Sequence, residues 1–531
     1  MRHRWKAVAV LAALAISVPG LAAPAHAIGP SLLPVTVTNN TGRGDAVYLY
    51  VIGINLNTNR LGYVNQGGAF TPWPAGQIPP SPAPDVAIGG PGNGGSTTIQ
   101  FPRGFSGRVY FSLGEKLKFF LTPDGLVQPA PWANGDANQN ILFDWSEFTY
   151  NDAGLWLNSS QVDMFAVPHI VSVTGGSGAV TSTGELLNNG RNNVINGIRG
   201  QAGWGNTVYT RSDGTVLRAL APGKAAGAGL LSATYLDSYI ASAWNAYTSK
   251  TLTVVPFADQ PNTRYFGRTS GNVMNFTNSA GQQVASFNRP SSASVWGCDG
   301  DLPAPNDLVV GPISRTLCAA LNRGTLGTID TQPSTNAADF YKNNPTNQYA
   351  RIIHSNMADG KAYAFAFDDV GNFESLVNDG EPRSAGIILT PFGAGGPTNP
   401  PPTGGGVPVV SNWNGKCIDV PSSNFIDGAP LQAWVCNGTN AQKWTFVNGA
   451  LQSQNNKCMD VAAGSTVNGA PIQLYTCNGT GAQQFVLSAA GDLVNPQANR
   501  CVDIKDWNAN DGARLQLWDC AGTANQKWHK G

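Results

Sequence analysis

Acidic, aromatic and amide side chains are concentrated in one short stretch of the chain, ILFDWSEFTYNDAGLWLNSSQVDMF. If the stretch begins as a β-strand, alternation of side chains puts Glu147 on one face together with Thr149, Asn151 and two aromatic rings. The Asn, Asp and Gly residues that follow predict a turn, after which a second segment leads to Asp163. Such a hairpin would place the carboxylates of Glu147 and Asp163 across one groove.

Two carboxylates in unlike surroundings are the requirement for glycoside hydrolysis. Apolar surroundings raise the pKa of a carboxyl group, which suits Glu147 as a general acid, whereas a solvated Asp163 would stay ionised as a base. The chain has five glutamates, and Glu147 has the most aromatic neighbours among them. The other interpretation is structural: Glu147 would pair with an arginine or lysine on a half-buried strand, and Asp163 would cap a turn.

Composition favours a mainly β protein of two or three domains that acts on a neutral partner. The 531 residues include 63 Gly and 36 Pro, and only 12% are charged, which is typical of strands and loops. Lys+Arg and Asp+Glu balance at 32 each, so no charged surface points to nucleic acid or to an anionic membrane. A neutral polymer is the expected ligand.

Residues 1–27 have the pattern of a secretory signal peptide. Three basic residues precede the apolar run Ala7–Val18, and the small residues end in Ala25–Ala27, an A-x-A cleavage site. A retained membrane anchor is the alternative, but the run is too short to span a bilayer comfortably. We expect a secreted, extracellular protein that has no membrane association after cleavage.

Strands are predicted along the first part of the chain and a mixed α/β section at about 180–330. Residues 33–52 read as two strands joined by a turn, and alternation predicts further strands at 96–101, 107–113 and 117–121. Apolar residues at helical spacing predict helices over 236–247 and, after Pro312, up to Asn322.

A second acidic pair, Asp368 and Asp369, ends a segment of strand character, AYAFAFDDVG. The pair has two interpretations: it lines the groove, or it forms a turn or cap at the end of the strand.

All eight cysteines lie after position 297, and export would oxidise them. Connectivity is formally ambiguous for eight cysteines. Six of them, however, form three pairs with the same spacing of nineteen inside three similar segments, and two remain. The predicted disulfides are Cys298–Cys318, Cys417–Cys436, Cys458–Cys477 and Cys501–Cys520.

A Gly- and Pro-rich linker at 394–407 separates residues 28–393 from a threefold internal repeat at 408–531. First cysteines recur at intervals of 41 and 43 residues. One such unit cannot bury its own apolar face, so three are expected to close around a pseudo-threefold axis. Trp444, Phe485 and Trp528 are the expected core residues.

Each repeat also carries an Asp, a Gln and an aromatic residue at matching positions. An aromatic platform beside a carboxylate and an amide fits the apolar face and the hydroxyls of a sugar, which is the favoured interpretation; the alternative is that the sets are repeat scaffolding. The three sets are Asp419, Gln432 and Trp434, then Asp460, Gln473 and Tyr475, then Asp503, Gln516 and Trp518.

The repeats resemble the ricin B type β-trefoil, carbohydrate-binding module family 13. The family's QxW signature stands here as Gln442-Lys443-Trp444, Gln483-Gln484-Phe485 and Gln526-Lys527-Trp528. The resemblance implies a sugar pocket that is most complete in the third repeat, where Asn525 precedes Gln526. The first two repeats have Ala441 and Ala482 at the position of Asn525.

Residues 28–393 resemble glycoside hydrolase family 64, the laminaripentaose-producing β-1,3-glucanases. The motifs are VTNNTGRGDAVYLYVIG, WSEFTYNDAGLW, QVDMF, APNDLVVGPISRTLCAAL and GKAYAFAFDDVG, and YAFAFDD is also similar to thaumatin-like proteins. The resemblance implies a thaumatin-like β-sandwich or barrel with a mixed α/β subdomain. It also implies an inverting mechanism with Glu147 as acid and Asp163 as base, and contacts from Thr149, Asn151 and Trp156 to the glucan.

The expected protein is therefore a secreted endo-type β-1,3-glucanase that releases short laminari-oligosaccharides, expected to include the pentasaccharide, from laminarin, curdlan or fungal cell-wall glucan. We expect a monomer without cofactor or metal. A thaumatin-like, antifungal glucan-binding lectin without turnover is the main alternative. A metal or serine hydrolase is disfavoured, because only His169, His354 and His529 follow the signal peptide and neither HExxH nor GxSxG occurs.

Overall fold

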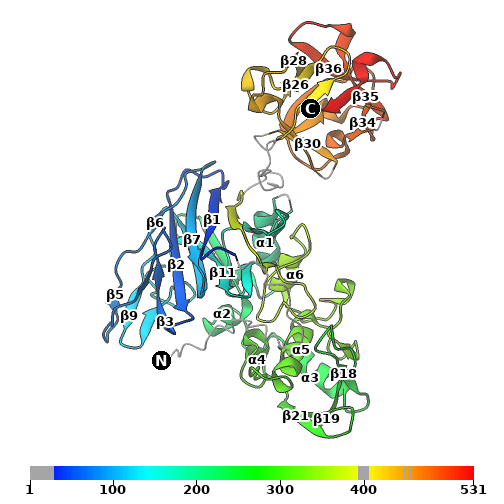
Figure 1. The fold of residues 1–531 in the computed structure, drawn as a ribbon. Coiled ribbons are helices and arrows are strands. Elements are labelled where there is room, and N and C mark those ends of the chain that lie inside the picture. The colour runs from blue at the N-terminus through cyan, green and yellow to red at the C-terminus, as the bar shows by residue number, and fades with distance from the viewer. Residues whose placement is uncertain (1–28, 188, 393–405, 448, 454–456, 489) are drawn as a thin grey trace, which may run out of the picture. The chain divides into compact units, whose positions relative to one another are not determined.

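The computed structural model describes residues 29–187, 189–392, 406–447, 449–453, 457–488 and 490–531 (Figure 1). The predicted signal peptide and most of the predicted linker lie outside these residues. The chain divides into two compact units, with the division after Phe392, and each unit is described by itself. Among the described residues, no helix is both long and apolar enough to cross a membrane.

A five-stranded sheet forms one layer of the first unit. Its β1 strand pairs in parallel with β24, and all other neighbours are antiparallel. The strands, in spatial order, are β15 (Val180–Thr183), β14 (His169–Thr174), β24 (Ser384–Leu389), β1 (Leu32–Asn39) and β7 (Ser96–Pro102).

An antiparallel sheet forms the second layer. A separate three-stranded sheet has β9 (Phe120–Thr122) at its centre, with β10 (Gly125–Val127) on one side and β5 (Ser81–Pro82) on the other. The second layer runs β23 (Leu376–Asp379), β12 (Gly154–Ser159), β11 (Leu142–Asn151), β8 (Phe105–Leu113), β2 (Val47–Asn55), β3 (Arg60–Val64) and β4 (Phe70–Pro72), with β6 (Ile88–Gly89) beside β2. Figure 1 shows the early strands of the two large sheets, β1, β2, β3 and β7, together in blue.

Apolar side chains from both layers form one core. Phe101 of β7 stacks on Phe148 of β11 with ring centroids 3.6 Å apart, and Val35 of β1 is fully buried. The two strands predicted for residues 33–52 are present, but they do not form a hairpin with each other, because β1 and β2 belong to different sheets. Asn39 stabilises the crossing by accepting hydrogen bonds from Thr41.

The predicted mixed α/β section is confirmed and has a second core of its own, around Trp244, Tyr247 and Leu317. Both predicted helices are present, as α3 (Asp237–Ala246) and α5 (Val310–Arg323), and α5 ends at Gly324 with φ of 75°. The remaining helices are α1 (Gly190–Arg199), α2 (Pro222–Gly227), α4 (Ser292–Gly297) and α6 (Gln348–His354). The remaining strands are β13 (Met164–Phe165), β16 (Val208–Thr210), β17 (Val216–Leu220), β18 (Leu252–Val254), β19 (Tyr265–Ser270), β20 (Val273–Thr277), β21 (Gln283–Asn288) and β22 (Thr331–Gln332).

All four predicted disulfides are present. Cys298 is the C-cap of α4, and its bridge to Cys318 ties that short helix to α5. The three bridges of the repeats have similar geometry, with Cα atoms 5.0 to 5.1 Å apart. The three bridges agree in geometry because the two cysteines of each pair are nineteen residues apart in similar repeats.

The strand character predicted for AYAFAFDDVG is wrong, since this segment forms turns around a buried ion pair. The Asp368 side chain is fully buried. Its Oδ1 lies 2.9 Å from Arg323 Nη2 in an ion pair, and its Oδ2 lies 2.9 Å from His354 Nε2. The carboxylate also accepts the backbone N–H of Ala364, and Phe367 adopts a φ of 66°. The hydrogen bonds and the ion pair that this buried carboxylate needs are formed in the turns and outweigh the local preference for a strand. Of the two interpretations of the acidic pair, the turn is therefore the one that holds for Asp368.

The second unit is a three-repeat β structure. Trp444, Phe485 and Trp528 are at most 2% exposed, and the indoles of the two tryptophans donate to the carbonyls of Ile418 and Val502. The predicted core is confirmed. The strands are β25 (Val409–Ser411), β26 (Lys416–Asp419), β27 (Ala429–Pro430), β28 (Gln432–Val435), β29 (Trp444–Val447), β30 (Ala450–Ser453), β31 (Lys457–Val461), β32 (Ile472–Thr476), β33 (Val486–Leu487), β34 (Leu493–Asn495), β35 (Arg500–Ile504), β36 (Ala513–Trp518) and β37 (Trp528–Lys530).

Candidate active site

Glu147 lies in the middle of a polar row that crosses three strands of the second layer. Its cross-strand partners are Arg108 on β8 and Asn158 on β12. The next row on the same face contains Ser106, Thr149 and Trp156. Cross-strand partners share one face of a sheet, so the alternation predicted from the sequence is confirmed.

The opposite face of β11 is structural. Phe148 belongs to the sandwich core, and Asp144 is 2% exposed. Burial raises the pKa of Asp144 to about 7, against the opposing effect of hydrogen bonds from the backbone N–H groups of Val167, Ala166 and Trp145. Asp144 therefore ties β11 to the segment after β13.

Asp163 approaches Glu147 from a different direction than predicted. The hairpin ends when β12 stops at Ser159, and Asp163 lies on a bend just before β13. The two carboxylates converge through Arg108, whose Nη2 lies 2.9 Å from Glu147 Oε1 and 3.4 Å from Asp163 Oδ2. The separation of these two oxygens cannot exceed the sum of the two distances.

Arg108 is the centre of the site. Its Nε donates to Glu147, its Nη1 donates to Gln128 at 3.2 Å, and its guanidinium lies 4.5 Å from the centroid of the Trp145 ring. Burial disfavours the charged form, but nearby Tyr110, Glu147 and Asp163 outweigh it and raise the pKa of Arg108 above its ordinary value. The surroundings of Glu147 are therefore aromatic and cationic, and not simply apolar as expected.

Pairing of Glu147 with an arginine was the structural alternative for this residue, and the contact is present. It does not remove Glu147 from a functional role, because the side chains of Glu147 and Asp163 keep 17% and 13% of their surface exposed. Both carboxylates thus remain accessible to a ligand while Arg108 holds them on one face of the site.

The three predicted sugar contacts lie on the same face as Glu147. Thr149 is 9% exposed and shares a 2.8 Å hydrogen bond with the Ser106 hydroxyl. Asn151 accepts the backbone N–H of Ala153 in the β11–β12 turn, and Trp156 is half-buried opposite Thr149. Asn151 therefore also holds the β11–β12 turn, and Thr149 links β11 to β8.

Sequence reasoning missed four side chains near the carboxylates: Arg108, Gln128, Lys224 and Asn158. Arg108 and Tyr110 are two positions apart on a predicted strand, so the sequence indicates that they share a face. The register that brings Arg108 beside Glu147 cannot be read from the sequence. Lys224 comes from α2, 61 positions after Asp163, and its Nζ lies 3.1 Å from Asp163 Oδ1. The buried Oδ1 of Asn158 has no hydrogen-bond partner among the described residues.

The three predicted sets in the repeats have nearly the same geometry. In each, the Gln side chain donates to the Asp carboxylate at 2.7 to 3.0 Å, and burial, opposed by these amides, raises the pKa of the Asp. The aromatic side chains remain open, with Trp434, Tyr475 and Trp518 exposed by 36%, 39% and 43%. Each repeat thus presents an exposed ring near a buried acid–amide pair.

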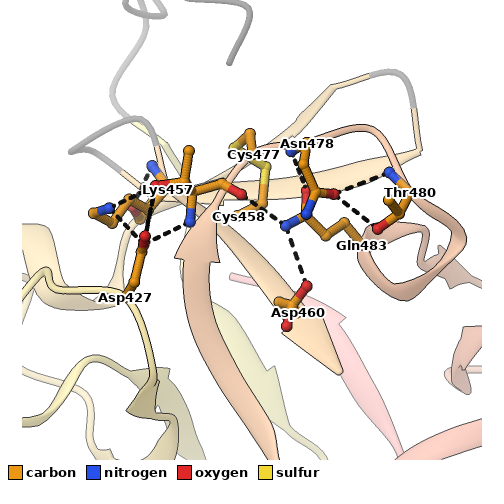
Figure 2. The surroundings of a disulfide bond; sticks show 10 residues. Asp427, Lys457, Cys458, Asp460, Cys477, Asn478, Thr480 and Gln483 are labelled. Carbon is orange, nitrogen blue, oxygen red and sulfur yellow. Dashed lines mark hydrogen bonds and ion pairs between the residues drawn. A yellow bond between two sulfur atoms is a disulfide. The ribbon is translucent and has the colours of Figure 1, made fainter. Parts of the chain in front are cut away.

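The QxW glutamines and Asn525 are buried next to these sets and form hydrogen bonds that hold them in place. Gln442, Gln483 and Gln526 are each 1% exposed and bond loop backbone groups. Figure 2 shows Gln483 between Asp460 and the loop of Asn478. In the third repeat, Asn525 adds a 2.7 Å bond to Asp503, so this carboxylate has one donor more than its counterparts.

No group of three or more His, Cys, Asp or Glu side chains within the described part of the chain is arranged to hold a metal ion. The chemistry that the first unit offers is that of two carboxylates, an arginine, a lysine and aromatic rings. The chemistry of the second unit is hydrogen bonding beside exposed rings.

Comparison with known proteins identifies both units. Residues 31–389 match the glycoside hydrolase family 64 model, described as β-1,3-glucanase, and residues 406–528 match the ricin-type β-trefoil lectin domain. A glucan endo-1,3-β-glucosidase of Cellulosimicrobium cellulans is 45% identical over 458 residues, which cover 84% of this chain and 82% of that protein.

Two crystal structures resemble the first unit. A laminaripentaose-producing β-1,3-glucanase in complex with laminaritetraose has a TM-score of 0.66 and 54% identity over 68% of this chain and 99% of that one. A β-1,3-glucanase domain from Clostridium beijerinckii has a TM-score of 0.58 and 25% identity over 68% and 99%. The chain therefore belongs to glycoside hydrolase family 64, the β-1,3-glucanases, and carries a C-terminal ricin B-type lectin domain.

Proposed function

We propose that this family 64 endo-1,3-β-glucanase is secreted and cleaves linear β-1,3-glucan with inversion, releasing short laminari-oligosaccharides that include the pentasaccharide. The observation that carries the proposal is the convergence of Glu147 and Asp163, from separate elements, on the guanidinium of Arg108. The similar crystal structure contains laminaritetraose, and its enzyme is described as laminaripentaose-producing, which supports the substrate class and the product.

The roles of the carboxylates follow from the proton balance of the reaction. Glu147 gives its proton to the glycosidic oxygen as the bond from that oxygen to the anomeric carbon breaks. Asp163 removes a proton from the water that attacks the same carbon on the opposite face. Inverting enzymes hold the two carboxyl groups about 6.5 to 9.5 Å apart, and retaining enzymes about 5 to 5.5 Å apart. Glu147 Oε1 and Asp163 Oδ2 lie 2.9 and 3.4 Å from one nitrogen of Arg108, so these two oxygens lie closer together than the inverting range. Inversion is therefore proposed from the resemblance to family 64, and the anomer of the first product tests it.

Thr149, Asn151 and Trp156 are proposed to bind the glucan beside this pair. Trp156 supplies a ring for the apolar face of a glucose unit, and the two polar side chains supply hydrogen bonds to hydroxyls. All three lie on the face of the sheet that carries Glu147. Asn158, opposite Glu147, adds an amide whose oxygen lacks a partner among the described residues.

The lectin domain is proposed to tether the enzyme to insoluble polysaccharide. Each repeat offers one exposed ring, so three weak sites can act together and raise the local concentration of the catalytic unit on the polymer. Secretion, proposed from the leader pattern of residues 1–27, would bring the enzyme to such a substrate.

The decisive experiment measures product length and reducing ends released from linear β-1,3-glucan by the wild type, Glu147→Gln and Asp163→Asn. Glu115→Gln and Asp152→Asn, which alter exposed acids, are matched controls. We expect at least a hundredfold loss of turnover for the first two and none for the controls. Nuclear magnetic resonance of the first product anomer should show the α form.

Three outcomes would contradict the proposal. Binding of glucan by the wild type without any cleavage would leave a recognition protein. A β-anomer as the first product would exclude inversion. Full activity of Asp163→Asn would remove the proposed base.

The tethering role is tested by replacing Trp434, Tyr475 and Trp518 together by alanine in the full chain. We expect hydrolysis of insoluble glucan to fall several-fold more than hydrolysis of soluble oligosaccharides, because only the former benefits from local concentration. Equal effects on both substrates would argue against tethering.

A further inference from the structure

Lys224 is fixed relative to Asp163 by the backbone on both sides. Strand β13, which begins directly after Asp163, pairs with β17, and helix α2 begins two residues after β17 ends. The backbone N–H of Ala221 donates to the carbonyl of Asp163 at 3.0 Å. The helix that carries Lys224 is therefore tied to the residue that its side chain contacts.

The contact places one cation on each oxygen of the Asp163 carboxylate. Lys224 Nζ lies 3.1 Å from Oδ1, and Arg108 Nη2 lies 3.4 Å from Oδ2. The ammonium also lies 4.5 Å from the centroid of the Trp132 ring, whose face stabilises a cation. Lys224 is 37% exposed and Asp163 is 13% exposed, so the ion pair is partly shielded from water.

The two carboxylates of the site are not equivalent. Among the described residues, the cation within ion-pair distance of Glu147 is Arg108, which Asp163 shares, whereas Asp163 has Lys224 in addition. Charge-assisted contacts to both oxygens of one carboxylate fix its orientation.

We infer that Lys224 is a positioning residue that holds the Asp163 carboxylate in the orientation in which it acts as the base. The inference rests on the proposed function and deepens it. Arg108 holds the other oxygen of the same carboxylate.

The charged and titratable groups that face Asp163 come from several elements. Arg108 and Tyr110 lie on β8, Lys224 on α2 and Glu147 on β11, and the effect of Asp163 on the pKa of Tyr349 places α6 nearby. Both tyrosines have pKa values raised by burial, so they stay neutral in the range in which a glycosidase works. Removal of Lys224 therefore changes the balance of charge around Asp163 by one full positive charge.

The test measures kcat and KM on a soluble laminari-oligosaccharide for the wild type, Lys224→Met and Lys224→Arg. Loss of a contact that orients the base slows the chemical step and leaves binding of the substrate intact. We expect kcat to fall about tenfold in Lys224→Met, with KM within a factor of about two. Lys224→Arg, which can donate to the same oxygen, should restore kcat.

Lys250→Met is the matched control, because Lys250 also pairs with an aspartate, Asp330 at 2.7 Å, and lies over a tyrosine ring at a distance from the site. Its kcat and KM should match those of the wild type. Lys224→Gln, a shorter and neutral polar side chain, replaces Lys224→Met if the latter does not fold.

The outcomes separate this inference from the proposed function. If the wild type cleaves, Asp163→Asn loses turnover and the neutral Lys224 variants keep the wild-type kcat, the role of Lys224 is refuted while the proposed function stands. An equal loss of kcat in Lys224→Met and Lys224→Arg refutes it as well. If the wild type does not cleave, the proposed function itself fails.

Discussion

Asp368→Asn removes one charge from the most deeply buried ion pair of the first unit. The Asp368 side chain is 0% exposed and its main partner, Arg323, is 2% exposed. Arg323 also donates to the carbonyl of Asp368 and lies 4.7 Å from the centroid of the Phe373 ring. An asparagine has nearly the same volume, so the variant changes the charge and one acceptor and leaves the packing intact.

The expected cost is about 3 kcal/mol of the free energy of unfolding. Removing one partner of a buried pair costs about 3 to 5 kcal/mol, because a charge is left uncompensated. The carbonyl contacts of Arg323 remain, which places the value at the lower end. For a unit of this size, that cost lowers the midpoint of thermal unfolding by about 4 °C.

Scanning calorimetry of the full chain provides the assay, because the lectin domain serves as an internal reference. The chain has two compact units, and only the transition of the first should move in Asp368→Asn. Asp330→Asn is the control, since Asp330 pairs with Lys250 at the surface, where the two side chains are 47% and 36% exposed. Exposed pairs contribute about 0 to 1 kcal/mol.

Two results would refute the reasoning. An unchanged first transition in Asp368→Asn would mean that the buried pair does not stabilise the fold. Loss of kcat/KM by more than about tenfold at 20 °C, where the variant is still folded, would return Asp368 to the substrate groove, the alternative that the burial argues against. We expect kcat/KM within a factor of about three.

Two further predictions concern stability. Burial disfavours the charged form of His354, but Asp368 and the Gly360 carbonyl outweigh it and raise the pKa of His354. The stabilisation is therefore complete below the ordinary value of about 6.5 and is lost as pH rises through the raised value. Denaturant titrations should show this loss for the wild type and not for His354→Gln. Trp528→Ala, which empties a core position of the lectin domain, should cost about 3 to 5 kcal/mol and lower only that domain's calorimetric transition.

Much of the architecture was readable because it depends on local pattern. The repeated spacing of cysteines and of QxW segments predicted three of the disulfides and the core of the lectin domain, and both are confirmed. Alternation along β11 predicted that Glu147 and Thr149 share a face, and helical spacing predicted α3 and α5. Such patterns survive folding because each of these elements buries one side against its neighbours.

The failures have a common cause, which is pairing between segments far apart in the chain. Strands β1 and β2 are adjacent in sequence but lie in different sheets. The segment AYAFAFDDVG has strand composition, yet it forms turns because Arg323, 45 positions before Asp368, supplies the partner for its carboxylate. Local propensity is weaker than the cost of a buried, unpaired charge.

The sequence by itself determined the chemistry that is available: two acids beside aromatic residues, three repeated acid–amide–aromatic sets, and the family to which the chain is similar. Only the tertiary structure decided the electrostatics of the site. The register of β8 against β11 brings Arg108 to Glu147, and the pairing of β13 with β17 brings Lys224 to Asp163. Coulombic interaction depends on distances of a few ångströms, and distances between remote segments are set by the fold and not by sequence spacing.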